Sequence, residues 1–385
     1  MDICFISKQF NPAGGGSERY AYEITRALTR RGHHVEVFTL GRRDEFHNHD
    51  FPDELSVTFI GNRRRKLVTF ETLFFSIVTK LEVNLEQFDV IHSTLMPASS
   101  IALSIGNCSI PMVVTSHGTS VGEIQSHKLE VPTDYLKKFA FHPMNLFMDI
   151  VTALNSSRVI AISSHSQDEL EKYYPIDSEH INRIPHGVND TRFRPDYDRH
   201  PAVSPNKCTL LHVGRLVSRK HVDLALHAVK QISRDTDIEL IIAGDGTHRD
   251  RLIKITKALD IENIVRFLGF VPEDELPPLY ASSDVFLLCS RYEGFGLTFL
   301  EAMSSGTPVI GTPVGGFPDL VTHNKSGIIV DHDSTDMATA IERIVSSDEL
   351  LSEMSTEARR VAKSQTWDAV AAETEAVYNS VIIDS

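Results

Sequence analysis

Two glutamates, Glu293 and Glu301, stand eight positions apart on either side of a Gly-Phe-Gly. The apolar run VFLLC before them predicts a buried strand, and LTFLEAMSSG predicts a helix that Gly306 ends. Gly294 and Gly296 leave the backbone free to present amide N–H groups to a bound group. One carboxylate before the helix and one inside it can bind two pairs of vicinal hydroxyls, such as those of a ribose and a hexose. The alternatives are an acid and base pair, as in a glycosidase, or a helix start with incidental acids.

Two cations follow another predicted strand, in HVGRLVSRKHVDLAL, residues 212–226. Arg215 and Lys220 lie in the loop before a helix that begins near Val222. A guanidinium offers a fork of donors and an ammonium offers a point charge, so the pair suits a diphosphate beside a helix N-terminus. The alternative is an exposed basic loop.

A glycine-rich loop, NPAGGGSERYAYEI, follows the first predicted strand. Its glycines Gly14 to Gly16 allow the backbone to approach a phosphate closely, and Ser17 could cap the next helix. A dinucleotide fingerprint with Glu36 as the ribose acid is one alternative, although its third glycine position falls on Arg19. A plain turn without a ligand is another.

A histidine stands at the end of a further predicted strand, in TSHGTS, residues 115–120. His117 beside Gly118 could bind a substrate hydroxyl or act as an acid or base near neutral pH. It could equally be an ordinary loop histidine, because the chain contains 18 histidines.

Apolar, β-branched runs alternate with segments of helical periodicity along the whole chain. This alternation predicts an α/β protein with two doubly wound parallel sheets, each covered on both faces. The first six runs are ICFIS, VEVFTL, VTFI, DVIHS, MVVTSHG and RVIAIS, and the second six are TLLHVGR, ELIIAGDG, IVRFLGF, DVFLLCS, TPVIGT and GIIVD. The polar, proline-bearing residues 187–207 predict the domain boundary.

Composition limits the classes of partner. The 385 residues suit two domains, and a net charge of −14 argues against general binding of nucleic acid. The four cysteines are scattered and predict reduced thiols rather than disulfides or a metal site. The N-terminus MDICFISKQF predicts a strand rather than a signal peptide, and no run is long and apolar enough to span a bilayer. We therefore expect a cytoplasmic protein.

Taken together, these loops resemble the retaining, nucleotide-sugar-dependent glycosyltransferases of family four (group 1), which have the two-domain GT-B architecture. The resemblance covers nearly the whole chain and is carried by GGGSER, SHG, IPHGVN, GRLVSRK, IAGDG, FLGFVPEDEL and EGFGLTFLEAMSSGTPVIGT. It implies an acceptor-side Rossmann-like domain over residues 1–190, a nucleotide-sugar donor domain over 191–364 and a final helix over 365–385 that crosses back to the first domain. IPHGVN departs from the family pattern, because His186 stands where asparagine is commoner.

The resemblance also implies roles for individual residues. Arg215 and Lys220 would hold the donor diphosphate and Glu293 a hydroxyl of the donor sugar, while Glu301 would hold the ribose and His117 would lie by the reacting carbon. The remaining donor contacts would come largely from backbone groups of Gly15, Gly16, Gly269, Phe270, Val271, Gly294, Phe295, Gly296 and Leu297.

The implied reaction is transfer of a hexose-type sugar from a nucleotide diphosphate, taken as UDP from its frequency in the family, to a glycan or lipid-linked acceptor. Anomeric configuration would be retained by front-face displacement, and we expect no cofactor and no metal. The triplet at Asp331, His332 and Asp333 resembles a metal-binding Asp-x-Asp but predicts a loop. The rival functions are a GT-B nucleotide-sugar epimerase and a non-catalytic sugar-nucleotide-binding protein.

A basic run precedes an apolar helical stretch in the first half and consists of Arg63, Arg64, Arg65 and Lys66. Such a cluster beside an amphipathic helix can dock on anionic lipid at a membrane surface. The alternative is a solvated arginine run before a helix that packs on the sheet.

Overall fold

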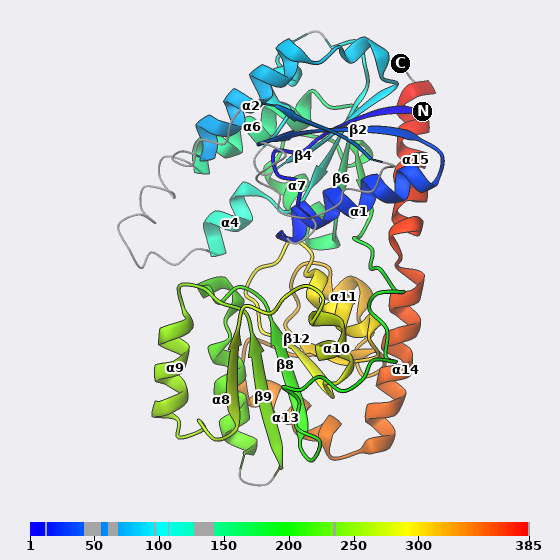
Figure 1. The fold of residues 1–385 in the computed structure, drawn as a ribbon. Helices are drawn as coiled ribbons and strands as arrows, with labels where there is room; N and C mark the ends of the chain where they lie inside the picture. Colours follow the sequence, from blue (N-terminus) through cyan, green and yellow to red (C-terminus); the bar gives the residue numbers. More distant parts are fainter. Residues whose placement is uncertain are drawn as a thin grey trace. The chain divides into compact units, whose positions relative to one another are not determined.

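Two parallel β-sheets form the framework of the computed structural model (Figure 1). The structure describes residues 1–11, 14–41, 55–60, 68–95, 98–106, 108–126, 142–233 and 236–383. The chain divides into unit 1, Met1–His186 with Trp367–Ser385, and unit 2, Gly187–Thr366. The sequence-based boundaries at 190/191 and 364/365 differ from these divisions by a few residues. The predicted architecture of two doubly wound parallel sheets is confirmed.

Unit 1 is built on a seven-stranded parallel sheet of order β3-β2-β1-β4-β5-β6-β7. Its strands are β1 (Asp2–Ile6), β2 (His34–Leu40), β3 (Ser56–Ile60), β4 (Val90–Leu95), β5 (Met112–Ser116), β6 (Arg158–Ala161) and β7 (Ile181–Arg183). Its helices are α1 (Gly16–Arg30), α2 (Val68–Glu82), α3 (Ile101–Ser104), α4 (Ser120–Ser126), α6 (His142–Leu154), α7 (Ser164–Tyr173) and α15 (Trp367–Ile383).

The C-terminal helix α15 belongs to unit 1 and packs along α1 (Figure 1). Its buried residues include Trp367, Val370 and Tyr378. Arg31, the C-cap residue of α1, pairs with Glu375 of α15 at 2.6 Å, but this pair is partly exposed and contributes little to stability. Burial of the apolar face therefore holds α15 in place.

Unit 2 is built on a six-stranded parallel sheet of order β10-β9-β8-β11-β12-β13. Its strands are β8 (Cys208–Val213), β9 (Ile238–Ala243), β10 (Val265–Gly269), β11 (Val285–Leu288), β12 (Val309–Gly311) and β13 (Gly327–Ile329). Its helices are α8 (Asp223–Ile232), α9 (Arg249–Ala258), α10 (Leu276–Ala281), α11 (Leu297–Ser304), α12 (Phe317–Leu320), α13 (Ser334–Val345) and α14 (Asp348–Ser364).

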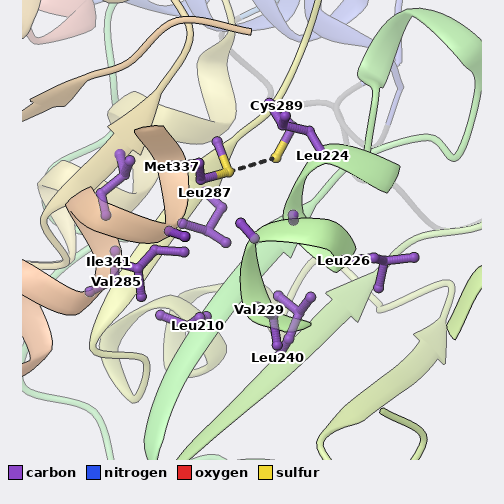
Figure 2. Close-up of a cluster of buried hydrophobic side chains, with 14 of the residues drawn as sticks. Leu210, Leu224, Leu226, Val229, Leu240, Val285, Leu287, Cys289, Met337 and Ile341 are labelled. Atoms are coloured by element: carbon purple, nitrogen blue, oxygen red, sulfur yellow. Dashed lines mark hydrogen bonds between the residues drawn. The ribbon is translucent and has the colours of Figure 1, made fainter. Parts of the chain in front are cut away.

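The core of unit 2 lies between its sheet and the helices α8, α9 and α13. Leu240 and Ile242 of β9 belong to this cluster, while the equally buried Ile241 between them points to the other face. Strands buried on both faces read as continuous apolar runs, which is why the sequence pattern was clear here. Figure 2 shows part of the cluster, in which the Cys289 thiol contacts the Met337 sulfur at 3.9 Å.

The structure differs from the sequence-based predictions at two points. Ser17 does not cap α1: the helix begins at Gly16 with Gly15 as its N-cap residue and no side-chain cap, so Ser17 lies inside the first turn. The strand β7 was not predicted, because its three residues Ile-Asn-Arg carry only one apolar side chain.

Candidate functional site

Lys220 and Glu293 of unit 2 meet at the point where the strand order of its sheet reverses. β8 pairs with β9 on one side and with β11 on the other, so the loops after β8 and β11 lie side by side. Ligands of open parallel sheets bind at such a point. The sequence singled out both loops separately, and the structure brings Lys220 and Glu293 together, with Nζ and Oε1 2.5 Å apart.

Glu293 is a buried carboxylate with several donors. The Ser290 hydroxyl donates to its Oε1 at 2.6 Å, and Arg219 approaches its Oε2 at 3.2 Å. Burial alone would raise the pKa of Glu293, but Lys220, Arg219 and the hydrogen bonds lower it to about 2. Glu293 is therefore ionised throughout the physiological range.

Arg219 is a site residue that our reading of the sequence missed. Its Nη1 also donates to the Tyr292 carbonyl at 3.0 Å, and its own carbonyl accepts from the Arg291 amide at 2.7 Å. It lies in the 3-10 turn η5 (Ser218–Lys220), next to Lys220. Its place directly before Lys220 was the only signal in the sequence, and chain position alone does not show which carboxylate it meets.

Arg215 is held differently from the other two cations. Its side chain is exposed and makes no hydrogen bond or ion pair with any residue that the structure describes. Burial lowers the pKa of Lys220, the charges of Arg219 and Arg215 lower it further, and Glu293 opposes the change. The charge of Arg215 thus influences the pKa of Lys220, and the guanidinium N–H groups of Arg215 remain available to a ligand.

Glu301 contacts a tyrosine hydroxyl. It is buried inside α11, and its Oε2 accepts a hydrogen bond from the Tyr280 hydroxyl at 2.9 Å. The Glu301 carboxylate can therefore accept a hydrogen bond from a hydroxyl group, as it does here from Tyr280 of α10.

The loop from Gly294 to Leu297 leads into the N-terminus of α11. Gly296 is the N-cap residue in a left-handed conformation, with φ 100°. The Phe295 side chain is buried and packs on Phe299, with ring centroids 5.5 Å apart. The Phe295 side chain is therefore part of the core, and the loop can offer its backbone amides to a ligand.

Gly269 is the last residue of β10, and Phe270 and Val271 follow it. The Gly269 carbonyl accepts from the Gly244 amide at 2.6 Å, which ties the segment to the loop after β9. A Cβ at Gly244 would lie 1.9 Å from the Gly214 carbonyl oxygen, so this close approach requires glycine. The Phe270 side chain is 75 % exposed beside it.

The site residues of the first half lie in unit 1. Gly15 and Gly16 follow β1, at the reversal of strand order between β1 and β4, and they begin α1. The alternative dinucleotide reading loses support, because Glu36 lies within β2 rather than at its end and accepts a hydrogen bond from Thr58.

His117 follows β5 and contacts two other rings. The Tyr20 ring meets it edge-on at a centroid distance of 4.7 Å, and the His186 ring lies at 5.3 Å. Neither His117 ring nitrogen bonds to a described residue. Burial lowers the pKa of His117 to about 3, so at neutral pH the ring is an uncharged hydrogen-bonding group rather than an acid.

His117 belongs to a buried cluster that sequence reasoning did not foresee. Tyr20 stacks on His186 at 4.9 Å, and its hydroxyl bonds to Thr115 at 3.0 Å. Thr115 also bonds to Nε2 of His92 at 2.8 Å. Burial, reinforced by the charge that His117 could carry, lowers the pKa of His92 to about 3 and that of His186 well below its usual value.

The Asp-x-Asp triplet forms a loop, and its second aspartate has a structural role. Asp333 caps α13 by accepting from the Thr335 amide at 2.7 Å. Among the described residues, no group of three or more His, Cys, Asp or Glu side chains is arranged to hold a metal ion.

Solved structures of other proteins share the fold of this chain. The sucrose-phosphate synthase of Thermosynechococcus elongatus superposes with a TM-score of 0.83 at 22 % identity and full coverage of both chains. HepE of Anabaena, solved with UDP and glucose, superposes with a TM-score of 0.75 at 20 % identity, covering 99 % of this chain and 100 % of that one. The fold is therefore GT-B.

Two family profiles match consecutive parts of the chain. Glycosyltransferase Family 4 matches residues 14–192, and Glycosyl transferases group 1 matches residues 193–361. The D-inositol 3-phosphate glycosyltransferase of Corynebacterium diphtheriae is 28 % identical, over 98 % of this chain and 94 % of that protein. The chain belongs to the group 1 glycosyltransferases of family four.

Proposed function

We propose that this glycosyltransferase moves a hexose-type sugar from a UDP-sugar to a hydroxyl of a glycan or lipid-linked acceptor, with retention of configuration and without a metal ion. The observation that carries the proposal is the meeting of Arg219 and Lys220 at Glu293, with Arg215 in the same loop after β8, at the strand-order reversal of unit 2. Three cations beside one carboxylate leave an excess of positive charge, which suits a diphosphate.

The reaction breaks the bond between the anomeric carbon and the diphosphate oxygen, and it forms a bond from the acceptor oxygen on the same face of the sugar. The departing phosphate oxygen takes the proton of the acceptor hydroxyl, so the chain need not supply a strong base. Its task is to stabilise the charge that grows on the diphosphate. A preorganised donor aimed at such charge is worth about 3–4 kcal/mol.

The protonation and hydrogen bonds of Glu293, His117 and Glu301 suggest a role for each of them. Ionised Glu293 can accept a hydrogen bond from a sugar hydroxyl while its charge is balanced by Arg219 and Lys220. Neutral His117, with both ring nitrogens unbonded to described residues, can bind a sugar oxygen but is a poor proton donor at pH 7. Glu301 would bind the ribose by rearranging its bond to Tyr280.

The donor is tested by a thermal-shift screen of uridine, guanosine and adenosine diphosphate sugars, with and without EDTA. UDP in the HepE complex supports uridine as the base. A ligand at a hundred times its Kd stabilises the folded protein by about 2.7 kcal/mol, so the correct donor should raise the unfolding midpoint clearly. Loss of the shift in EDTA would contradict metal independence, and no shift with any of the three would contradict the donor site.

A lipid-linked acceptor is supported by an exposed apolar face on α2. Phe74, Ile77 and Leu81 are 55 %, 44 % and 80 % exposed, and their spacing places them on one side of the helix. The basic residues Arg63 to Lys66, which precede this helix in the chain, lie outside the described residues. Within the described ranges, no helix combines the length and apolarity needed to cross a bilayer.

Sedimentation with anionic liposomes tests this membrane contact. We expect binding at low salt that weakens at high salt, because each basic residue near the surface contributes about 1 kcal/mol. Replacing Leu81 and Phe74 by serine should reduce binding, while the matched change of the exposed Lys254 and Lys257 of α9 to glutamine should not. Absence of binding at low salt would remove the membrane from the proposal.

A further inference from the structure

Two cations share one buried carboxylate in unit 2, and they are held in different ways. The side chains of Glu293 and Lys220 are 7 % and 10 % exposed, and that of Arg219 is 22 % exposed. The Arg219 guanidinium contacts both Glu293 and the Tyr292 carbonyl, while its backbone carbonyl binds the Arg291 amide. Arg219 is thereby fixed to the loop that carries Glu293.

Lys220 is held by fewer contacts. Within the described part of the chain, its ammonium bonds only to Glu293. Nζ lies 3.7 Å from the position that a Cβ on Gly214 would take, next to a residue without a side chain. Lys220 and the unpaired Arg215 are therefore the cations that can turn their donors to a ligand, whereas Arg219 stays with Glu293.

A single carboxylate at 2.5 Å would cancel most of the charge of Lys220 if no other cation balanced it. A lysine neutralised in this way attracts a diphosphate weakly. With Arg219 on the other carboxylate oxygen, the cluster of Arg219, Lys220 and Glu293 keeps a net positive charge, to which Arg215 adds.

We propose that Arg219 is a positioning residue: it holds and balances the Glu293 carboxylate, so that the charge of Lys220 stays available to the diphosphate of the donor. This inference rests on the proposed function, because it assumes that Lys220 binds the diphosphate. Arg219 acts through Glu293 and touches no phosphate. Its removal should therefore matter only while Glu293 is charged.

Calorimetric binding of UDP tests this with a double-mutant cycle. UDP has no sugar, so any role of Glu293 towards sugar hydroxyls does not enter. Arg219→Gln should weaken UDP binding about tenfold, within the range of coupling between neighbouring charges. In the Glu293→Gln background, the same change should weaken binding less than about twofold. Arg219→Lys, which restores the charge, should recover most of the affinity.

Several outcomes would overturn the inference. Equal losses in both backgrounds would show that Arg219 contacts the phosphate itself. A loss that Glu293→Gln does not rescue, with a lowered unfolding midpoint, would show a merely structural role. Wild-type affinity in Arg219→Gln would show no role at all. Arg343→Gln on the surface of α13 is the matched control and should bind UDP normally.

The same titrations separate this inference from the proposed function. If wild type binds UDP and Lys220→Ala weakens binding while Arg219→Gln does not, only the inference fails. If Lys220→Ala leaves binding of UDP, GDP and ADP unchanged, the proposed diphosphate site itself fails.

Discussion

His92, His117 and His186 are neutral groups in the interior of unit 1, and this has a measurable cost. The rings lie around Tyr20, and burial lowers the pKa of His92 and His117 to about 3 and that of His186 well below its usual value. An unfolded histidine titrates near 6.5. Below that pH the unfolded chain binds protons that the folded chain does not, so acid favours unfolding.

The free energy of unfolding of unit 1 should therefore fall as the pH drops from about 6.5 towards 3, by about 1.4 kcal/mol per pH unit for each histidine. His186→Asn should remove one such contribution and flatten the slope. Trp367 is the only tryptophan of the chain and lies 5.8 Å from the His186 ring, so its fluorescence in urea titrations follows unit 1.

An unchanged slope in His186→Asn would show that His186 takes up its proton in the folded state, contrary to its burial.

Among the elements of unit 2, the glycine-rich turn after β12 supports the loop that carries Glu293. Gly315 has a φ of 58°, and a Cβ there would lie 2.7 Å from the Phe295 carbonyl oxygen and 2.9 Å from Cβ of Glu293. The Gly316 amide also donates to the Phe295 carbonyl at 3.0 Å. The turn after β12 thus fixes the turn after β11.

Gly315→Ala should lower stability by about 2–4 kcal/mol, because it adds backbone strain and a clash that shifts the loop. It should also raise the KM for the donor, since Glu293 moves with the loop. Gly32→Ala is the matched control: Gly32 has a φ of 88° but nothing within 4 Å of the added Cβ, so it should cost only about 1 kcal/mol.

Urea unfolding and donor kinetics on the two variants make the comparison. Equal losses of stability would show that the turn after β12 does not constrain the loop of Glu293.

The elements also show what sequence could and could not predict. The buried strands of unit 2 were predicted because both of their faces are apolar, whereas β7 was missed because it is short and polar. The loops of Lys220 and Glu293 were each predicted as sites. Their contact was not, because it depends on the pairing of β8 with β11, which local periodicity does not encode.

The same limit applied to side-chain partners. Sequence placed Glu301 in a helix but could not show its bond to Tyr280, and it gave Arg219 no partner at all. Such contacts form only when distant segments meet.

The whole chain consists of two units, and each contains a parallel sheet with a reversal of strand order. In each unit the candidate residues follow strands at the reversal of strand order: Gly15 and Gly16 after β1, and Arg215 and Lys220 after β8. Family profiles match one half of the chain each, with the junction at residues 192 and 193. In the proposed reaction, unit 2 supplies the positive charge that stabilises the leaving diphosphate.

Steady-state transfer kinetics of Arg215→Ala and Lys220→Ala, with the donor found in the thermal-shift screen, test this most directly. Each variant should turn over about a hundredfold more slowly or worse, because each loses one donor to the growing charge. The unfolding midpoint of Arg215→Ala should stay near that of wild type, whereas Lys220→Ala should also lower it, because it removes a partner of the buried Glu293. Arg343→Ala, a surface change on α13, should have normal kinetics. Near-normal turnover in both site variants would contradict the account.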